Sequence, residues 1–195
     1  MNSAPEKPKV IVVCGPTGIG KTTVGIELAQ RFNGEIVSAD SMQIYRYMNI
    51  GTAKPTAEEL DKIAHHMIDI VDPDEDYDAV LFSKQARDQV TEITSRGLVP
   101  FIVGGTGLYI KAILHGLFQA KAIDSEVRKR LKREAEENSS GFLFERLKRV
   151  DPAAADRIHP NDSYRIIRAL ETLESSGKTI SDHHQNHKFR DDPFN

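Results

Sequence analysis

A glycine-rich loop between a predicted strand and a predicted helix constrains this chain more than any other feature. Its residues, Gly15-Pro16-Thr17-Gly18-Ile19-Gly20-Lys21-Thr22, match the pattern Gly-x-x-x-x-Gly-Lys-Ser/Thr at every fixed position. The apolar run 10–14 before the loop is typical of a buried strand. After the loop, apolar residues recur at helical spacing, at Val24, Leu28, Ala29 and Phe32. Strand, loop and helix in this order are the context in which the motif binds phosphate.

The residue types in the loop suit a phosphate group. Glycines let successive backbone N–H groups turn inward, and the helix N-terminus adds partial positive charge. Lys21 supplies a full charge, and the Thr22 hydroxyl can ligate Mg²⁺. Average residue usage gives a chance match of about one in a hundred for a chain of this length. We therefore predict that residues 15–22 bind a di- or triphosphate.

Composition places the chain among ordinary globular proteins. Hydrophobic residues make up 39% and charged residues 28% of its 195 residues, enough for one well-buried domain with a small insertion. No apolar run is long enough to span a membrane, and residues 1–9 have no apolar signal core. Cys14 is the only cysteine, which favours a reduced, cytoplasmic location. With a net charge of −3, nucleic-acid binding would require a local basic patch.

Asp40 is the second candidate for chemistry. It follows the short predicted strand 35–39, so it is expected at the carboxyl end of a sheet strand, where open α/β folds bind ligands. A carboxylate there can hold Mg²⁺ through water or accept a proton from a substrate. The alternative is a turn or helix-capping residue. We favour the functional interpretation because position and chemistry agree.

Two further strands and their helices complete the predicted core. Residues 67–71 and 99–103 are the expected third and fourth strands. The fourth leads into Gly104-Gly105-Thr106-Gly107, which is either a tight packing turn or a substrate contact through Thr106. Alternation of strands and helices predicts an α/β fold of the P-loop NTPase type, with a parallel sheet flanked by helices. We predict that residues 1–119 form this core.

A basic helical insertion is predicted over residues 120–160, with a return to the core and a polar tail over 161–195. Residues 125–138 have helical periodicity, with a narrow apolar stripe. Within this insertion, the stretch 128–149 alone contains eight cations: Arg128, Lys129, Arg130, Lys132, Arg133, Arg146, Lys148 and Arg149. They form either a solvated helix face or a surface that grips a polyanion.

Several motifs together resemble those of the tRNA dimethylallyltransferase (tRNA isopentenyltransferase) family. They are GPTGIGKT at 15–22, DSMQIYR at 40–46, GTAKP at 51–55 and GGTGLYIK at 104–111. HHMIDI at 65–70 and HPNDSYRIIRALE at 159–171 add to them, so the resemblance covers nearly the whole chain. Members of this family usually continue beyond the equivalent of residue 195. The resemblance therefore implies that this chain is an incomplete fragment, and it leaves open whether a chain of this length is active or inactive.

The resemblance implies transfer of a dimethylallyl group from dimethylallyl diphosphate to the N6 amine of the tRNA adenine 3′-adjacent to the anticodon, with Mg²⁺. It implies that Thr17 and Lys21 act on the diphosphate within the loop. Asp40 would accept a proton or hydrogen bond from the adenine amine. The implied tRNA contacts are Asp40, Ser41, Met42, Gln43, Thr106 and Arg128. We expect tRNA and dimethylallyl diphosphate as partners of a monomer that does not associate with membranes.

Other functions of the same loop stay open. A nucleoside or nucleotide kinase would use it for ATP, although the fourth strand ends in Gly104-Gly105 rather than in an acid for Mg²⁺. An adenylate isopentenyltransferase would prenylate free adenine nucleotides instead of tRNA. A non-catalytic GTPase-type switch would require an Asn-Lys-x-Asp motif, which the sequence lacks.

Overall fold

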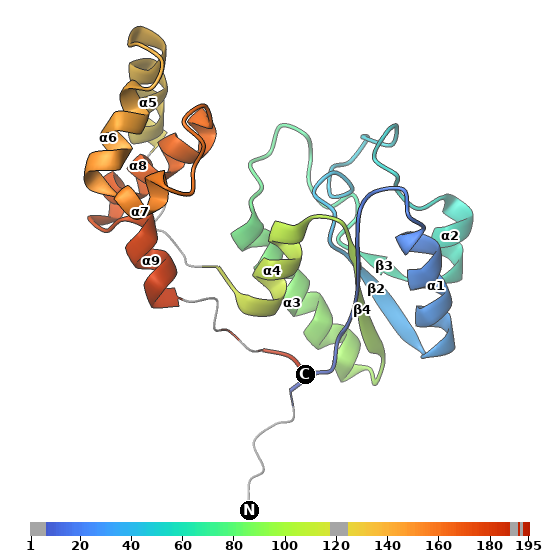
Figure 1. The fold of residues 1–195 in the computed structure, drawn as a ribbon. Helices are drawn as coiled ribbons and strands as arrows, with labels where there is room; N and C mark the ends of the chain where they lie inside the picture. The colour runs from blue at the N-terminus through green and yellow to red at the C-terminus, as the bar shows by residue number, and fades with distance from the viewer. Residues whose placement is uncertain (1–6, 118–124, 188–190, 192) are drawn as a thin grey trace, which may run out of the picture. The chain divides into compact units, whose positions relative to one another are not determined.

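The computed structural model describes residues 7–117, 125–187, 191 and 193–195 (Figure 1). The chain divides into two compact units, Met1–Leu117 with Arg190–Asn195, and Phe118–Phe189. The first combines strands and helices and is called the α/β unit. The second is helical over its described residues and is called the helical unit.

A parallel sheet forms the centre of the α/β unit. Its strands are β1 (Ile11–Cys14), β2 (Gly34–Ser38), β3 (His65–His66) and β4 (Val99–Gly104), in the spatial order β1-β4-β2-β3. Each pairing between neighbours is parallel. The carboxyl ends of the strands therefore meet at one edge of the sheet, and the predicted α/β fold class is confirmed.

The third strand differs from its predicted bounds. The apolar pattern predicts a strand over 67–71, but β3 is two residues long and ends before this segment. Met67 and Asp69 have φ angles of 64° and 54°, which extended backbone does not adopt. A single parallel bridge between Tyr45 and Val71 follows. The prediction is wrong in its bounds because two left-handed residues interrupt the extended chain.

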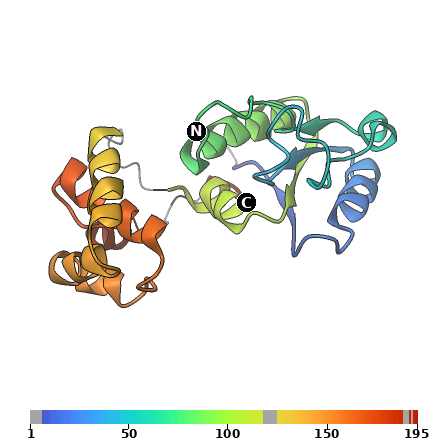
Figure 2. The same ribbon diagram turned by 90° about the horizontal axis from the view of Figure 1, so that it is seen from above.

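Helices cover both faces of the sheet. On one face, α1 (Lys21–Arg31) contributes Ile26 and Ala29 to a cluster with side chains of β2 and β4. On the other face, α3 (Ala79–Ser95) and α4 (Gly107–His115) pack on alternate residues of the same strands. Figures 1 and 2 show α1 and α3 on opposite sides of the sheet. Strands covered on both sides explain the almost continuous apolar runs in the sequence.

Local capping chemistry agrees with the sequence. Thr56 and Glu59, a Thr-x-x-Glu pattern that predicts a capping box, form one at the start of α2 (Ala57–Lys62), a short helix without buried residues. The Asp78 carboxylate accepts hydrogen bonds from the backbone N–H groups of Val80 and Leu81 in the first turn of α3. Gly97, with a φ of 75°, follows the end of α3. These signals act within a few residues, so the sequence alone predicts them.

The helical unit has a core of its own. Its helices are α5 (Ser125–Glu137), α6 (Phe142–Val150), α7 (Pro152–Ala155), α8 (Ser163–Ser176) and α9 (Ile180–His187). Leu131 of α5, Leu147 of α6 and Leu170 of α8 lie in one buried cluster. The predicted return of residues 161–195 to the sheet core must therefore be corrected. The apolar face of α8 packs on α5 and α6, and only the last residues of the chain group with the α/β unit.

The last described residue lies beside the chain segment that leads into β1. Asn195 donates its backbone N–H to Pro8 O at 2.9 Å and accepts from Val10 N at 3.1 Å. These two bonds follow the pattern of a parallel pairing. In the described ranges, neither unit contains a helix long and apolar enough to cross a membrane.

Candidate functional site

A pocket of about 160 Å³ lies at the carboxyl edge of the sheet. Seven residues predicted from the sequence line it: Thr17, Gly18, Gly20, Lys21, Thr22, Asp40 and Gln43. Seven others complete the lining: Ile36, Ser38, Ala53, Pro55, His65, Val103 and Gly104. The fold thus brings the glycine-rich loop and the segment after β2 together around one space.

The glycine-rich loop has the backbone geometry of an anion site. Gly18 and Gly20 have φ angles of 85° and 86°, a region that glycine enters without steric cost. No side chain caps the N-terminus of α1, so its first backbone N–H groups can serve an anion. Lys21 Nζ donates to the Pro16 carbonyl at 2.6 Å, which keeps the ammonium beside the loop. This part of the pocket suits a phosphate group.

Asp40 contributes a carboxylate to the same pocket. Its Oδ1 accepts a hydrogen bond from the Met42 N–H at 2.9 Å, which closes a local turn. Within the described part of the chain, Oδ2 accepts no hydrogen bond. Asp40 is therefore both a turn residue and a pocket residue, and one of its oxygens remains for a ligand.

Gln43 is a buried amide with a fixed orientation. Its side-chain carbonyl accepts from the Ser38 hydroxyl at 2.9 Å, and its Nε2 donates to the Ala53 carbonyl at 2.8 Å. Ser38 and Ala53 were not predicted as pocket residues. The position of Ser38 at the end of β2 was the available signal, because ligands bind at that edge. The contact with Ala53 depends on the path of the loop after Gln43.

Ser41, Met42 and Thr106 lie next to the pocket lining. The Thr106 hydroxyl accepts from the Ser41 N–H at 2.9 Å and donates to the Ser41 hydroxyl at 3.2 Å. This pair joins the segment after β2 to the turn after β4. At Gly104 an added Cβ would meet the Ala39 carbonyl oxygen at 2.2 Å, so close packing explains this glycine. Thr106 is placed to support the site, and its contact with a substrate stays a prediction.

Uncharged residues form the remaining pocket wall. Ile36, Ala53, Pro55 and Val103 contribute apolar groups. His65 joins them, and burial lowers the pKa of its imidazole below the ordinary value. The neutral ring donates from Nδ1 to the Ile63 carbonyl at 2.9 Å. One pocket therefore offers donors and a cation for phosphate, and an uncharged wall for an apolar group.

Arg128 lies in the helical unit and is engaged there. Its Nε and Nη2 donate to the two carboxylate oxygens of Glu171, at 2.9 and 3.0 Å. Arg168 donates to the same carboxylate at 3.1 Å, and the Glu171 side chain is only 1% exposed. The structure therefore gives Arg128 a role in packing α5 on α8. Its predicted contact with tRNA is not tested by this arrangement.

Most of the other predicted cations are also paired. Arg130 and Arg146 each contact both Glu134 and Glu174, while Lys129 and Lys148 pair with glutamates three residues earlier. In the described part of the helical unit, no ion pair forms at Lys132, Arg133 or Arg149. A count of charges along α5 and α6 misses the acids that α8 supplies.

The oxygen groups at the pocket fit the predicted Mg²⁺. Thr22 contributes a hydroxyl and Asp40 a carboxylate. Among the described residues, no group of three or more His, Cys, Asp or Glu side chains could form a metal cage. Mg²⁺ commonly uses one or two carboxylates together with substrate phosphates and water, so this sparse set is compatible with it. His66 pairs with Glu35 at 2.7 Å, so this histidine has a structural role.

The sequence matches one family model and curated proteins that are named tRNA dimethylallyltransferase. Residues 43–195 match the model of the IPP transferase family. The chain is 54% identical over 190 residues to a tRNA dimethylallyltransferase of Desulfosudis oleivorans, covering 97% of this chain and 60% of that protein. It is 47% identical to tRNA dimethylallyltransferase 2 of Syntrophus aciditrophicus, covering 100% of this chain and 62% of that protein.

A solved structure agrees with these matches. A eukaryotic dimethylallyltransferase acting on tRNA superposes with a TM-score of 0.80 at 33% identity, over 95% of this chain and 46% of that chain. The present chain thus spans about 60% of the length of the curated relatives. Both the family match, which covers most of the residues, and the pocket motifs lead to one assignment: the chain belongs to the IPP transferase family.

Proposed function

We propose that this chain carries the catalytic core for transfer of a dimethylallyl group from dimethylallyl diphosphate to the N6 amine of the tRNA adenine 3′-adjacent to the anticodon. One observation carries the proposal: a single pocket combines a phosphate loop, a carboxylate and an uncharged wall. Each of these parts suits one part of the reaction. The names of the relatives support the same substrates.

The pocket residues have distinct roles in this reaction. As the bond between N6 and the prenyl carbon forms, the bond from that carbon to the diphosphate oxygen breaks, and the oxygen keeps the electron pair. Lys21, Thr17 and the loop N–H groups stabilise the charge on the leaving diphosphate. Asp40 accepts the proton of the amine through Oδ2. Ile36 and Val103 provide apolar surface for the dimethylallyl group.

Mg²⁺ is part of this proposal. Thr22 is the residue that would hold it, together with oxygens of the diphosphate. When bound, it supplies positive charge that favours departure of diphosphate. The preceding roles of Lys21 and Asp40 do not depend on its coordination geometry.

The tRNA contacts form the outer part of the site. We assign the target base to Asp40, Ser41, Met42 and Gln43, which requires the adenine to leave its stack. Thr106 supports this segment through its contact with the Ser41 N–H. For Arg128, the proposal requires that its guanidinium serve tRNA and Glu171 together. We further propose a monomer in the cytoplasm, for which light scattering and fractionation are the tests.

Labelled dimethylallyl diphosphate tests the proposed reaction. It is incubated with tRNA and either this chain or a version extended at its C-terminus to the length of the relatives. We expect label in the tRNA adenine, with the extended version more active. Parallel reactions use ATP labelled at its γ-phosphate, and AMP as a competing acceptor. Label transferred from ATP alone would identify a kinase, and preferential prenylation of AMP would identify an adenylate isopentenyltransferase.

A further inference from the structure

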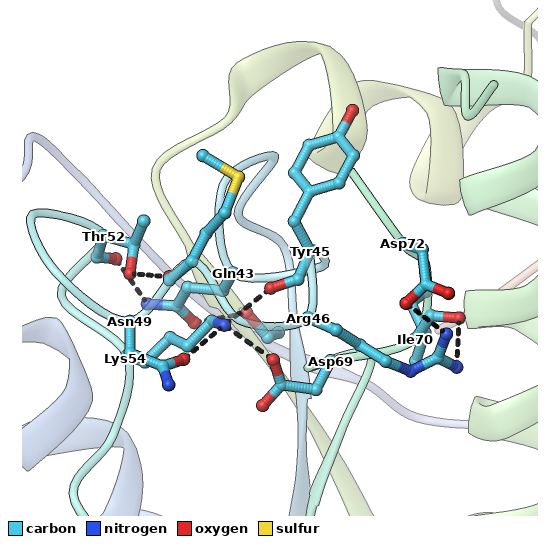
Figure 3. A network of polar contacts seen from close by, with 11 residues as sticks. Gln43, Tyr45, Arg46, Asn49, Thr52, Lys54, Asp69, Ile70 and Asp72 are labelled. Carbon is cyan, nitrogen blue, oxygen red and sulfur yellow. Dashed lines mark hydrogen bonds and ion pairs between the residues drawn. The ribbon is translucent and has the colours of Figure 1, made fainter. Parts of the chain in front are cut away.

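Lys54 is an ammonium buried next to the pocket, outside its lining. Its side chain is 8% exposed. Its Nζ contacts the Tyr45 carbonyl at 2.6 Å, Asn49 Oδ1 at 2.9 Å and Asp69 Oδ1 at 2.6 Å (Figure 3). These three acceptors match the three N–H donors of an ammonium group. Lys54 thus joins its own loop to the segment after β2 and to the segment after β3.

Two short routes connect Lys54 with the pocket wall. Asp69, which accepts from Lys54, donates its backbone N–H to the Gln43 carbonyl at 3.0 Å. Ala53, the neighbour of Lys54 in the chain, accepts from Gln43 Nε2 at 2.8 Å. Both routes end at Gln43, whose side chain lines the pocket. A change at Lys54 would therefore reach the wall without removing a pocket residue.

The same segments contain strained backbone. Tyr47, Ala53, Met67 and Asp69 have φ angles of 65°, 49°, 64° and 54°. Residues other than glycine rarely adopt this left-handed backbone conformation, so the surrounding contacts must stabilise it here. Lys54 binds directly to Asp69 and follows Ala53 in the chain. Its hydrogen bonds are well placed to maintain this conformation.

We propose that Lys54 is a positioning residue that sets the shape of the pocket wall at Asp40 and Gln43, and through it the placement of the acceptor base. Burying an ammonium is unfavourable unless it is fully paired, and Lys54 keeps its three acceptors only while these segments hold their present arrangement. The identity of the acceptor rests on the proposed function. The positioning of the wall rests only on the contacts of Lys54.

The pair Arg46–Asp72 provides a matched control. It joins the segment after β2 to the segment after β3, with Arg46 Nη1 at 3.1 Å from Asp72 Oδ1. Its side chains are 40% and 43% exposed, so solvent screens the pair. Figure 3 shows both contacts in one view. Asp72→Asn therefore removes an ion pair of similar placement without leaving a buried charge.

Hydrogen exchange measures the positioning directly. Lys54→Met removes the three donors but keeps the length of the side chain. We expect the backbone amides of residues 41–53 to exchange at least about tenfold faster, because a local structural unit opens more often. Amides of β2 and β4 should keep their protection, and pyrophosphate affinity should change less than about twofold, since Lys21 is untouched. Asp72→Asn should match the wild type in both measurements.

Kinetics in the extended version tests the consequence for the base. For Lys54→Met, kcat/KM for tRNA should fall by about tenfold or more while KM for dimethylallyl diphosphate stays constant, because misplacement of a reacting group lowers the rate steeply. Lys54→Arg should restore part of the loss, since it keeps the charge but not the three-donor geometry. A general structural defect would instead change the kinetic constants for tRNA and for dimethylallyl diphosphate together.

The outcomes separate this inference from the proposed function. If the wild type transfers no dimethylallyl group, the proposed function fails, and hydrogen exchange still decides the role of Lys54. Unchanged exchange over residues 41–53 in Lys54→Met would overturn the positioning role. If Lys54→Met does not fold, Asp69→Asn takes its place, because asparagine tolerates the left-handed backbone and weakens the same contact. It should show a smaller increase in exchange over the same residues, and wild-type exchange would overturn the inference.

Discussion

The α/β unit and the helical unit use positive charge in different ways. At the pocket of the α/β unit, Lys21 lies beside backbone N–H groups, and its hydrogen-bond partner is a neutral carbonyl. In the helical unit, glutamates from α5, α6 and α8 neutralise most of the basic residues of α5 and α6. Lys21 thus keeps its charge for a ligand, whereas Arg128 contributes chiefly to packing. The number of cations in a segment is a poor guide to its partner.

The two units differ also in how far apart in the sequence their contacting residues are. Lys21 contacts the carbonyl of a residue five positions away, within one motif. Arg128 and Glu171 are 43 positions apart. Motif matching therefore finds Lys21 and its loop, while the contact of Arg128 with Glu171 appears only when α5 and α8 pack together. Four experiments test this contrast, in order of decreasing expected effect.

Asp40→Asn should have the largest effect. In the extended version we expect dimethylallyl transfer to fall by about 10²–10⁴-fold, the usual contribution of a general base, because asparagine has nearly the same size but is a far weaker base. Single-turnover transfer measures the rate, and pyrophosphate calorimetry serves as the control. Turnover within a factor of two of the wild type would contradict the proton-acceptor role. Loss of pyrophosphate affinity would indicate that Asp40 holds Mg²⁺ instead.

Lys21→Ala should remove most of the diphosphate binding while the fold survives. Charge-assisted hydrogen bonds contribute about 1.5–3 kcal/mol, so affinity should fall by roughly 10- to 150-fold. Calorimetry with pyrophosphate measures the loss, and far-UV circular dichroism checks the fold. Lys132→Ala is the control from the helical unit and should leave pyrophosphate affinity unchanged. Equal pyrophosphate affinities of Lys21→Ala and the wild type would contradict the statement that Lys21 keeps its charge for a ligand.

Glu171→Gln should destabilise the helical unit without affecting the pocket. The change leaves two guanidinium groups with a neutral acceptor in a site that is 1% exposed. We expect a loss of about 1–3 kcal/mol in the free energy of unfolding, with solvent around the arginines limiting it. Urea unfolding provides the measurement. Glu145→Gln, which breaks the exposed Lys148 pair, should cost less than about 0.5 kcal/mol. Equal effects of the two changes would contradict the structural role of Glu171.

The smallest expected effect concerns tRNA binding by the helical unit. Lys132, Arg133 and Arg149 form no ion pair among the described residues, which leaves their charges for a polyanion. Removing one cation that binds a phosphate should reduce the salt slope of log affinity by about 0.7–0.9, so replacing all three with Gln should flatten it by roughly 2. tRNA binding across a salt series measures this, with Lys129→Gln, which breaks an exposed pair, as the control. Parallel lines for the triple variant and the wild type would favour a solvated helix face.

Local patterns in the sequence were sufficient for the fold class and for placing the glycine-rich loop and Asp40 at the carboxyl edge of the sheet. The strand before the glycine-rich loop, the loop itself and the position of Asp40 after β2 all follow from rules that act within about ten residues. The capping box at Thr56 and Glu59 has the same origin. In these segments, residues close in the sequence determine the backbone geometry and the side chains present, so the sequence alone predicts them.

The tertiary structure decided what distant segments do to one another. The third strand is shorter than predicted because Met67 and Asp69 have left-handed backbone angles. Helix α8 was predicted to pack on the sheet core, but it packs within the helical unit. The tertiary structure also paired Lys54 with Asp69, 15 positions away, and Arg128 with Glu171. No periodicity encodes such pairs, because their energy depends on where the folded chain places a second charge and how much water it excludes.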